Sequence, residues 1–187
     1  MQPHDLAHAT ICWLPAWESH PSQTMFTAGI FSAQELSSQN SRIYRWSVPA
    51  ERFENPPDAT IREILAAPKT IAVVGCSADP TRDSHRIARL LQLRGHRVIP
   101  INPAEREILG ETCHPSLREV PARVDMVDVF RRSEFVAGIV ADAIAIAAPI
   151  LWLQLGVVDE QAALAARRAG LTVVMDRCPK IEYARLF

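Results

Sequence analysis

From residue 52 onward the sequence predicts a doubly wound α/β domain, in which helices cover both faces of a parallel sheet. Short, near-continuous runs of Val, Ile and Leu alternate with segments whose apolar residues recur at helical spacing. This alternation is typical of a parallel sheet that is buried on both faces. The first run, Thr70–Val74, also ends at Gly75 and is followed by an amphipathic segment, as in strand–turn–helix units.

Five strands are expected, each a short apolar run that ends at a glycine or a polar residue. Their ranges are Thr70–Val74, Arg97–Ile101, Met126–Phe130, Ile150–Leu155 and Leu171–Met175. We expect one sheet with the strand order 3-2-1-4-5, which is the Rossmann-like arrangement. The chain has 187 residues, of which 48% are hydrophobic, and this suffices for one such core and hardly for two.

Helices are expected between these strands. Each begins near a residue that can cap a helix and ends at a proline, a glycine or the next strand. The expected spans run from Asp58 or Thr60 to Pro68, from Ser84 to Gly95, from Ser133 to Ala148 and from Asp159 to Gly170.

Residues 1–51 lack this regularity. They contain three of the four tryptophans, few basic residues and several prolines that interrupt any helical or strand period. We predict a poorly ordered or irregular N-terminal extension, either a flexible arm or a stretch upstream of the natural start. An alternative is an arm that docks Trp13, Trp17 or Trp46 on a protein partner.

Charge and cysteine usage narrow the function classes. Twenty basic and 21 acidic residues give a net charge of −1, so neither nucleic acid nor a membrane is an expected partner. The four cysteines are scattered. This pattern argues against a metal site or a disulfide framework and favours a reducing, cytoplasmic location.

Polar residues follow the expected strands at the point where each one ends. In doubly wound sheets, ligands bind at this carboxyl edge, near the place where the strand order reverses. The clusters at the edge are Gly75-Cys76-Ser77, Asn102-Pro103, Arg131-Arg132, Gln154 and Asp176-Arg177. Backbone N–H groups of the first loop and the positive end of the following helix would together attract a phosphate. The sequence therefore predicts a binding site for a phosphate-bearing ligand.

A classical dinucleotide site is disfavoured. Its G-x-G-x-x-G motif would need a glycine where Ser77 stands, and Asn102 takes the place of the acidic residue that would bind the ribose. The basic residues expected around the loop are Arg82, His85, Arg86 and Arg131. They favour a ligand with more phosphate than NAD. An NAD(P)- or nucleotide-dependent enzyme or regulator stays an alternative.

A set of motifs is spread from about Phe53 to Leu186. They are Phe53-Glu-Asn-Pro, Ile71-Ala-Val-Val-Gly-Cys-Ser, Val98-Ile-Pro-Ile-Asn-Pro, Ile108-Leu-Gly-Glu, Val127-Asp-Val-Phe-Arg-Arg, Trp152-Leu-Gln-Leu-Gly and Met175-Asp-Arg-Cys-Pro-Lys. In combination they resemble the small stand-alone CoA-binding proteins. The resemblance implies a Rossmann-like domain, over residues 52–187, related to the CoA-binding domain of the succinyl-CoA synthetase alpha chain. We expect no ligase activity, because the synthetase's domain with the phosphorylated histidine has no counterpart in this sequence.

The resemblance implies that coenzyme A or an acyl-CoA is the cofactor. The implied binding residues are Gly75, Cys76, Ser77, Ala78, Arg82, Ser84, His85, Asn102, Pro103, Phe130, Arg131, Gln154 and Gly156. The loop 75–78 would hold the pyrophosphate through backbone N–H groups, and residues 102–103 would contact the adenosine part. Phe130 and Arg131 would border the adenine or a phosphate, and residues 154–156 would line the path of the pantetheine.

No convincing catalytic arrangement is evident, so we predict a binding protein without chemistry of its own; a protein-interaction module is a further alternative. Ser84 and His85 are neighbours on a helix and therefore point to different sides. Asp128, in the middle of a strand, is interpreted as a structural hydrogen-bonding residue. Reaction of Cys76 or Cys178 with the CoA thiol or its disulfide is a hypothesis, for which simple packing is the alternative. A homodimer or another protein partner is left open.

Overall fold

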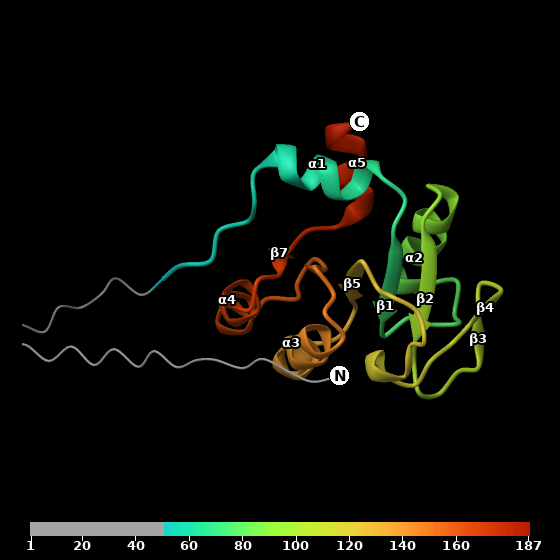
Figure 1. Ribbon diagram of the computed structural model, residues 1–187. Helices are drawn as coiled ribbons and strands as arrows, with labels where there is room; N and C mark the ends of the chain where they lie inside the picture. Colours follow the sequence, from blue (N-terminus) through green and yellow to red (C-terminus); the bar gives the residue numbers. More distant parts are fainter. Residues whose placement is uncertain (1–50) are drawn as a thin grey trace, which may run out of the picture. The chain divides into compact units, whose positions relative to one another are not determined.

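The computed structural model describes residues 51–187 (Figure 1), so the expected extension over residues 1–51 lies outside the described residues except for Glu51. The strands are β1 (Thr70–Val74), β2 (Arg97–Ile101), β3 (Glu107–Ile108), β4 (Glu111–Thr112), β5 (Met126–Val129), β6 (Ile150–Leu153) and β7 (Thr172–Val174). The α-helices are α1 (Asp58–Ala66), α2 (Asp83–Leu93), α3 (Val136–Ala145), α4 (Glu160–Arg168) and α5 (Pro179–Leu186).

Five parallel strands form the main sheet, in the order β2-β1-β5-β6-β7. This confirms the expected doubly wound, Rossmann-like α/β fold. The short strands β3 and β4 form a separate antiparallel pair, which the sequence analysis did not anticipate.

One detail of the expected strand order is corrected. The expected order 3-2-1-4-5 places the third predicted strand on the outer side of β2. Within the described residues, that side of β2 instead has a single parallel bridge, between Ile101 and His114. The strand expected there, β5, instead pairs with β1 on the other side. Pro115 follows the bridge, and because proline has no N–H to donate, the pairing beside β2 does not continue.

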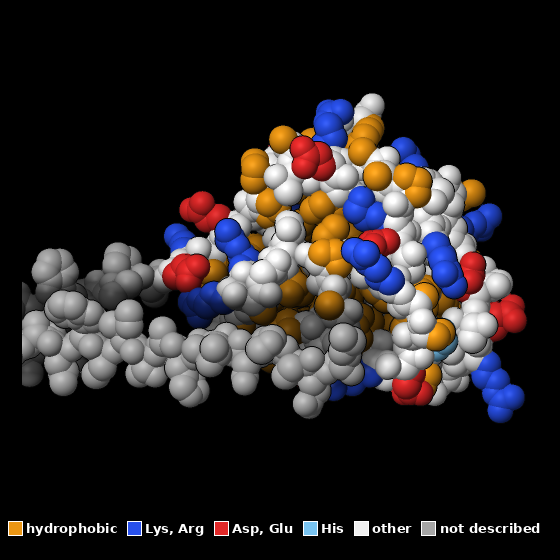
Figure 2. All heavy atoms as spheres, viewed as in Figure 1, with side chains coloured by type: hydrophobic (Ala, Val, Ile, Leu, Met, Phe, Trp, Pro, Cys, Tyr) orange, Lys and Arg blue, Asp and Glu red, His pale blue; other side chains and the backbone are white. Residues whose placement is uncertain are grey.

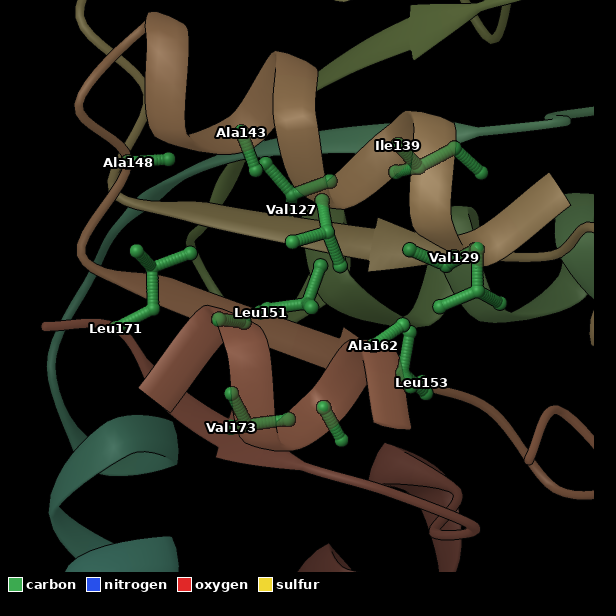
Figure 3. Packing of buried hydrophobic residues seen from close by; sticks show 14 of the residues in the cluster. Val127, Val129, Ile139, Ala143, Ala148, Leu151, Leu153, Ala162, Leu171 and Val173 are labelled. Carbon is green, nitrogen blue, oxygen red and sulfur yellow. The ribbon is translucent and has the colours of Figure 1, made fainter. Parts of the chain in front are cut away.

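Different helices cover the two faces of the sheet. Successive side chains of a strand point to opposite faces, and in β1 Ile71 belongs to the core shared with α1, α2 and α5, while Ala72 belongs to the core shared with α3 and α4. Figure 3 shows Val127 of β5 beside Ala143 of α3, in the same core as Leu151 of β6. The carboxyl ends of the strands are thereby held between two helical layers (Figure 1).

Several helix ends follow the sequence signals. The Asp159 carboxylate accepts a hydrogen bond at 2.9 Å from the N–H three residues further on, which confirms it as the N-cap of α4. Gly95 ends α2 with a φ of 85°. Ser133 does not cap α3: its Oγ accepts a hydrogen bond at 3.0 Å from the N–H of Val158, and a 3₁₀ turn over Ser133–Phe135 precedes the helix.

The C-terminal helix α5 was not predicted. It is anchored by Tyr183, whose hydroxyl donates to the Leu65 carbonyl at 2.9 Å and lies 2.7 Å from Nε2 of buried His96. These contacts come from α1 and from the segment after α2, which are far from α5 in the sequence. The periodicity of the apolar residues in α5 therefore could not predict them. None of the described helices is long and apolar enough to cross a membrane.

Candidate functional site

The loop between β1 and α2 is held against the start of α2 by side chains of that helix. Ser77 donates its N–H to Ser84 Oγ at 3.1 Å. The ring Nδ1 of His85 lies 2.9 Å from the Ser77 carbonyl oxygen, so this nitrogen carries the proton and donates. Both side chains therefore shape the loop, and neither contacts the other as a nucleophile would contact its base.

These hydrogen bonds reduce the number of backbone N–H groups that the loop can offer to a pyrophosphate. Gly75 already donates its N–H to the Ile101 carbonyl at 2.9 Å, and the N–H of Ser77 is used by Ser84. Of the four loop residues, Cys76 and Ala78 keep N–H groups that no acceptor among the described residues takes. The loop can therefore offer two backbone donors to an anion.

Asn102, at the end of β2, ties the same loop to the next strand. Its Nδ2 donates to the Cys76 carbonyl at 2.8 Å, and its Oδ1 accepts from the N–H of Ala104 at 3.0 Å. Because both ends of its amide are occupied, Asn102 positions the loop. The next residue, Pro103, is exposed at this strand end.

Gly75 brings the loop against the end of β5. A Cβ atom at this position would lie 2.8 Å from the Phe130 carbonyl oxygen and 2.9 Å from Arg131 Cδ. Its φ of 82° also lies in the left-handed region that favours glycine. The loop after β1 and the cluster after β5 are thus in direct contact.

A cavity of about 920 Å³ opens at the carboxyl edge, between α2, the ends of β5 and β6, and the start of α5. Four of the predicted binding residues line it, namely Phe130, Arg131, Gln154 and Gly156. The other nine do not: Gly75, Cys76, Ser77, Ala78, Arg82, Ser84, His85, Asn102 and Pro103. These nine lie on the loop after β1, at the start of α2 and at the end of β2.

The cavity combines positive charge with apolar surface. Five basic residues and one acidic residue line it: Arg86, Arg89, Arg131, Arg132, Lys180 and Asp83. Asp83 is paired with Arg86 at 2.5 Å. Leu93, Leu155 and Ile181 are more than half exposed and also line the cavity. Figure 2 shows basic and apolar side chains close together on one face of the molecule. Such a surface suits a polyanion that also has an apolar part.

Arg131 lines the cavity and also adjoins Gly75 of the loop after β1. Its guanidinium carbon lies 4.8 Å from the centre of the Phe135 ring, an arrangement that holds the side chain without neutralising it. Within residues 51–187 no carboxylate forms an ion pair with it. Its charge is therefore available to an anionic ligand.

The comparisons with known proteins agree with this geometry. The family described as "CoA binding domain" matches residues 69–184. The chain belongs to this family.

This CoA-binding-domain protein is 42% identical over 132 residues to the uncharacterized protein YneT of Bacillus subtilis, an alignment that covers 71% of this chain and 98% of YneT. A solved structure of a hypothetical protein from Pyrococcus horikoshii OT3 is similar, with a TM-score of 0.68 and 35% identity over 73% of this chain and 98% of that one. The alpha subunit of acetate–CoA ligase (ADP-forming) II from Pyrococcus furiosus is 33% identical over 70 residues, which are 37% of this chain and 15% of that subunit. These findings confirm the resemblance on which the sequence analysis relied.

Several cavity residues of this CoA-binding-domain protein were not predicted as site residues. Among them are Arg89, Leu90, Leu93, Lys180 and Ile181. The first three lie with Arg86 at spacings of three, four and seven residues, which places them on one face of α2. This helical spacing was the sequence signal that could have identified them as neighbours on one surface. The last two lie on α5, which was not predicted.

Beneath the cavity lies a buried polar pair. Gln154 is 4% exposed and donates through Nε2 to Asp128 Oδ1 at 2.6 Å. Asp128 is fully buried in β5, and burial raises the pKa of its carboxyl to about 7, although the bond from Gln154 opposes this shift. The interpretation of Asp128 as a hydrogen-bonding residue agrees with this contact.

The cysteine hypothesis is corrected at one position. Cys76 is fully buried, and this burial raises the pKa of its thiol to about 12. A thiolate is therefore disfavoured at Cys76, and this residue is a poor candidate for the reaction with CoA. Cys178 is half-buried and lines the cavity, so it is the accessible thiol of the site.

We predict that Cys178 reacts with the disulfide form of CoA at pH 8, while Cys76 and Cys113 stay unmodified in the folded protein. At that pH a thiol with a pKa of about 12 is ionised to roughly one part in ten thousand, and only the thiolate attacks. Peptide mass spectrometry of a Cys12→Ser chain measures the adducts. Cys178→Ser in the same background is the control, and a fast adduct at Cys76 would contradict the prediction.

Proposed function

We propose that this chain binds coenzyme A or an acyl-CoA at the carboxyl edge of its sheet and performs no chemistry on it. The observation that carries the proposal is the cavity, in which five basic residues and one acidic residue surround apolar side chains. CoA has the matching composition, since phosphates and an uncharged pantetheine arm are joined in one molecule.

The loop after β1 supports the same ligand. The N–H groups of Cys76 and Ala78 and the N-terminus of α2 would attract a phosphate. The contact between Gly75 and the end of β5 brings this loop next to Arg131, which lines the cavity. A ligand with phosphates at the loop and an extended arm in the cavity would use both.

The comparisons and the described side chains favour binding without catalysis. The related ligases are named for a reaction with CoA, and this chain matches only 15% of the subunit from Pyrococcus furiosus. Ser84 and His85 are both engaged in holding the loop. The three cysteines of residues 51–187 are free, which supports the cytoplasmic location that we include in the proposal.

Calorimetric titration of the full chain with CoA, acetyl-CoA, 3′-dephospho-CoA and NAD tests the proposal. We expect saturable binding of CoA that weakens without the 3′-phosphate. Arg131→Ala should weaken CoA binding about tenfold to a hundredfold, because a charge-assisted hydrogen bond contributes about 1.5–3 kcal/mol.

Arg97→Ala is the matched control. Arg97 is exposed at the first residue of β2, on the opposite edge of the sheet, so its removal should leave CoA binding unchanged. Binding of NAD without binding of CoA would refute the proposal in favour of a nucleotide-dependent protein. Equal losses from the two arginine variants would refute the assignment of the site to the cavity.

A further inference from the structure

Asp128 is an unusual residue to find in the central strand of a sheet. Its neighbours in register are Val73 of β1 and Trp152 of β6, both fully buried. A carboxyl group in such surroundings is costly unless it is fully hydrogen-bonded. Oδ2 of Asp128 is nevertheless the one buried side-chain nitrogen or oxygen without a hydrogen-bond partner within residues 51–187.

The hydrogen-bond partner of Asp128 connects it to the cavity. Its Oδ1 accepts from Nε2 of Gln154 at 2.6 Å, and Gln154 lines the cavity. The carboxamide of Gln154 has two ends, an N–H₂ group that donates and an oxygen that accepts. Because Asp128 takes the donating end, the accepting Oε1 is the end left to the cavity.

In its ionised form, which dominates at pH 8.5, the Asp128 carboxylate can only accept hydrogen bonds, so at that pH it selects one of the two orientations of the neighbouring amide. Without Asp128, Gln154 could present either its oxygen or its N–H₂ group to a ligand. Gln154 is a polar group in a part of the cavity that Phe130 and Val157 also line. Asp128 therefore determines whether Gln154 presents an acceptor or a donor to a ligand there.

We propose that Asp128 is a positioning residue that orients Gln154 so that its Oε1 accepts a hydrogen bond from an amide N–H of a ligand's pantetheine arm. This inference rests on the proposed binding of CoA. The pantetheine arm carries two amide N–H groups, whereas the phosphates of CoA are acceptors and would not bind to an oxygen. The adenine amino group and the ribose hydroxyl of CoA are also donors, and adenosine 3′,5′-bisphosphate, which keeps both, distinguishes the nucleotide from the arm in the test.

The test compares two ligands by calorimetry at pH 8.5, CoA and adenosine 3′,5′-bisphosphate, which lacks the pantetheine arm. Asp128→Leu should weaken CoA binding about threefold to tenfold, the effect of one hydrogen bond, and leave the bisphosphate within twofold. Asp128→Asn keeps the shape but carries a donor as well as an acceptor, so it no longer selects the orientation of Gln154; it should weaken CoA binding about threefold and leave the bisphosphate within twofold. It also serves as the second variant if the leucine substitution prevents folding.

A double-mutant cycle with Gln154→Met separates positioning from a general structural role. In the Gln154→Met background, Asp128→Leu should cause no further loss of CoA affinity, because its effect is transmitted through Gln154. Effects that multiply, or equal losses for both ligands, would overturn the inference. If the variants bind CoA as the parent does, the inference alone falls. If the parent binds neither ligand, the proposed function is refuted and the inference falls with it.

Discussion

Gly75→Ala should lower the free energy of unfolding by about 2–5 kcal/mol. A side chain at a φ of 82° costs about 1–2 kcal/mol in the left-handed region. The new Cβ would also meet the Phe130 carbonyl oxygen at 2.8 Å and Arg131 Cδ at 2.9 Å. The carbonyl belongs to the backbone and cannot rotate away, so overpacking adds about 1–3 kcal/mol. Urea unfolding followed by circular dichroism measures the change.

Gly95→Ala separates the two causes. Gly95 has a nearly equal φ of 85°, and a Cβ there would meet nothing within 4 Å. Its substitution should therefore cost only the backbone contribution, about 1–2 kcal/mol. Equal losses from the two variants would show that the contact between the loop and the end of β5 is looser than described.

Glu182→Ala should destabilise the protein by about 2–3 kcal/mol. Glu182 is 1% exposed and accepts from Arg177 at 3.3 Å and from Arg185 at 2.6 Å. Arg185 also pairs with Asp58 of α1, so the Glu182 carboxylate orients the arginine that links α5 to α1. Removing one partner of a buried ion pair costs about 3–5 kcal/mol. The figure is lower here because both arginine side chains are about 40% exposed and can be hydrated.

Two further variants check this assignment by thermal or urea unfolding. Glu182→Gln keeps the shape and one hydrogen-bond acceptor, so its loss should be smaller, about 1–2 kcal/mol. Asp58→Asn should have a much weaker effect, because Asp58 is exposed and its ion pair is screened by solvent. A loss from Asp58→Asn as large as that from Glu182→Ala would show that the exposed pair, and not the buried carboxylate, anchors α5.

The sequence predicted the helices and strands best where their signals are local. Alternating apolar runs and cap residues such as Asp159 reflect contacts within a few residues, and these elements were placed to within a few positions. The place of β5 beside β1 depends on which strand ends can meet in space. The bridge at His114 depends on pairing with Ile101 across the hairpin of β3 and β4. The periodicity of apolar residues along the chain predicts neither the strand order nor this bridge.

The candidate site shows the same division. Strand-end residues and the family motifs pointed to the carboxyl edge, and they did so because parallel strands all end on the same side. Four of the thirteen predicted residues line the cavity, and the rest cluster on the loop beside it. The sequence did not indicate that Ser84 and His85 would be engaged by the loop itself.

By itself, then, the sequence determined the parallel α/β architecture, the family and the edge at which a ligand is expected, because each of these follows from local pattern and motif. Only the tertiary structure decided the shape of the cavity. Its walls come from α2 and α5, which meet across the sheet edge through packing and not through sequence proximity. The pairing of Asp128 with Gln154, 26 residues apart, was likewise decided by strand register, which brings β5 and β6 side by side.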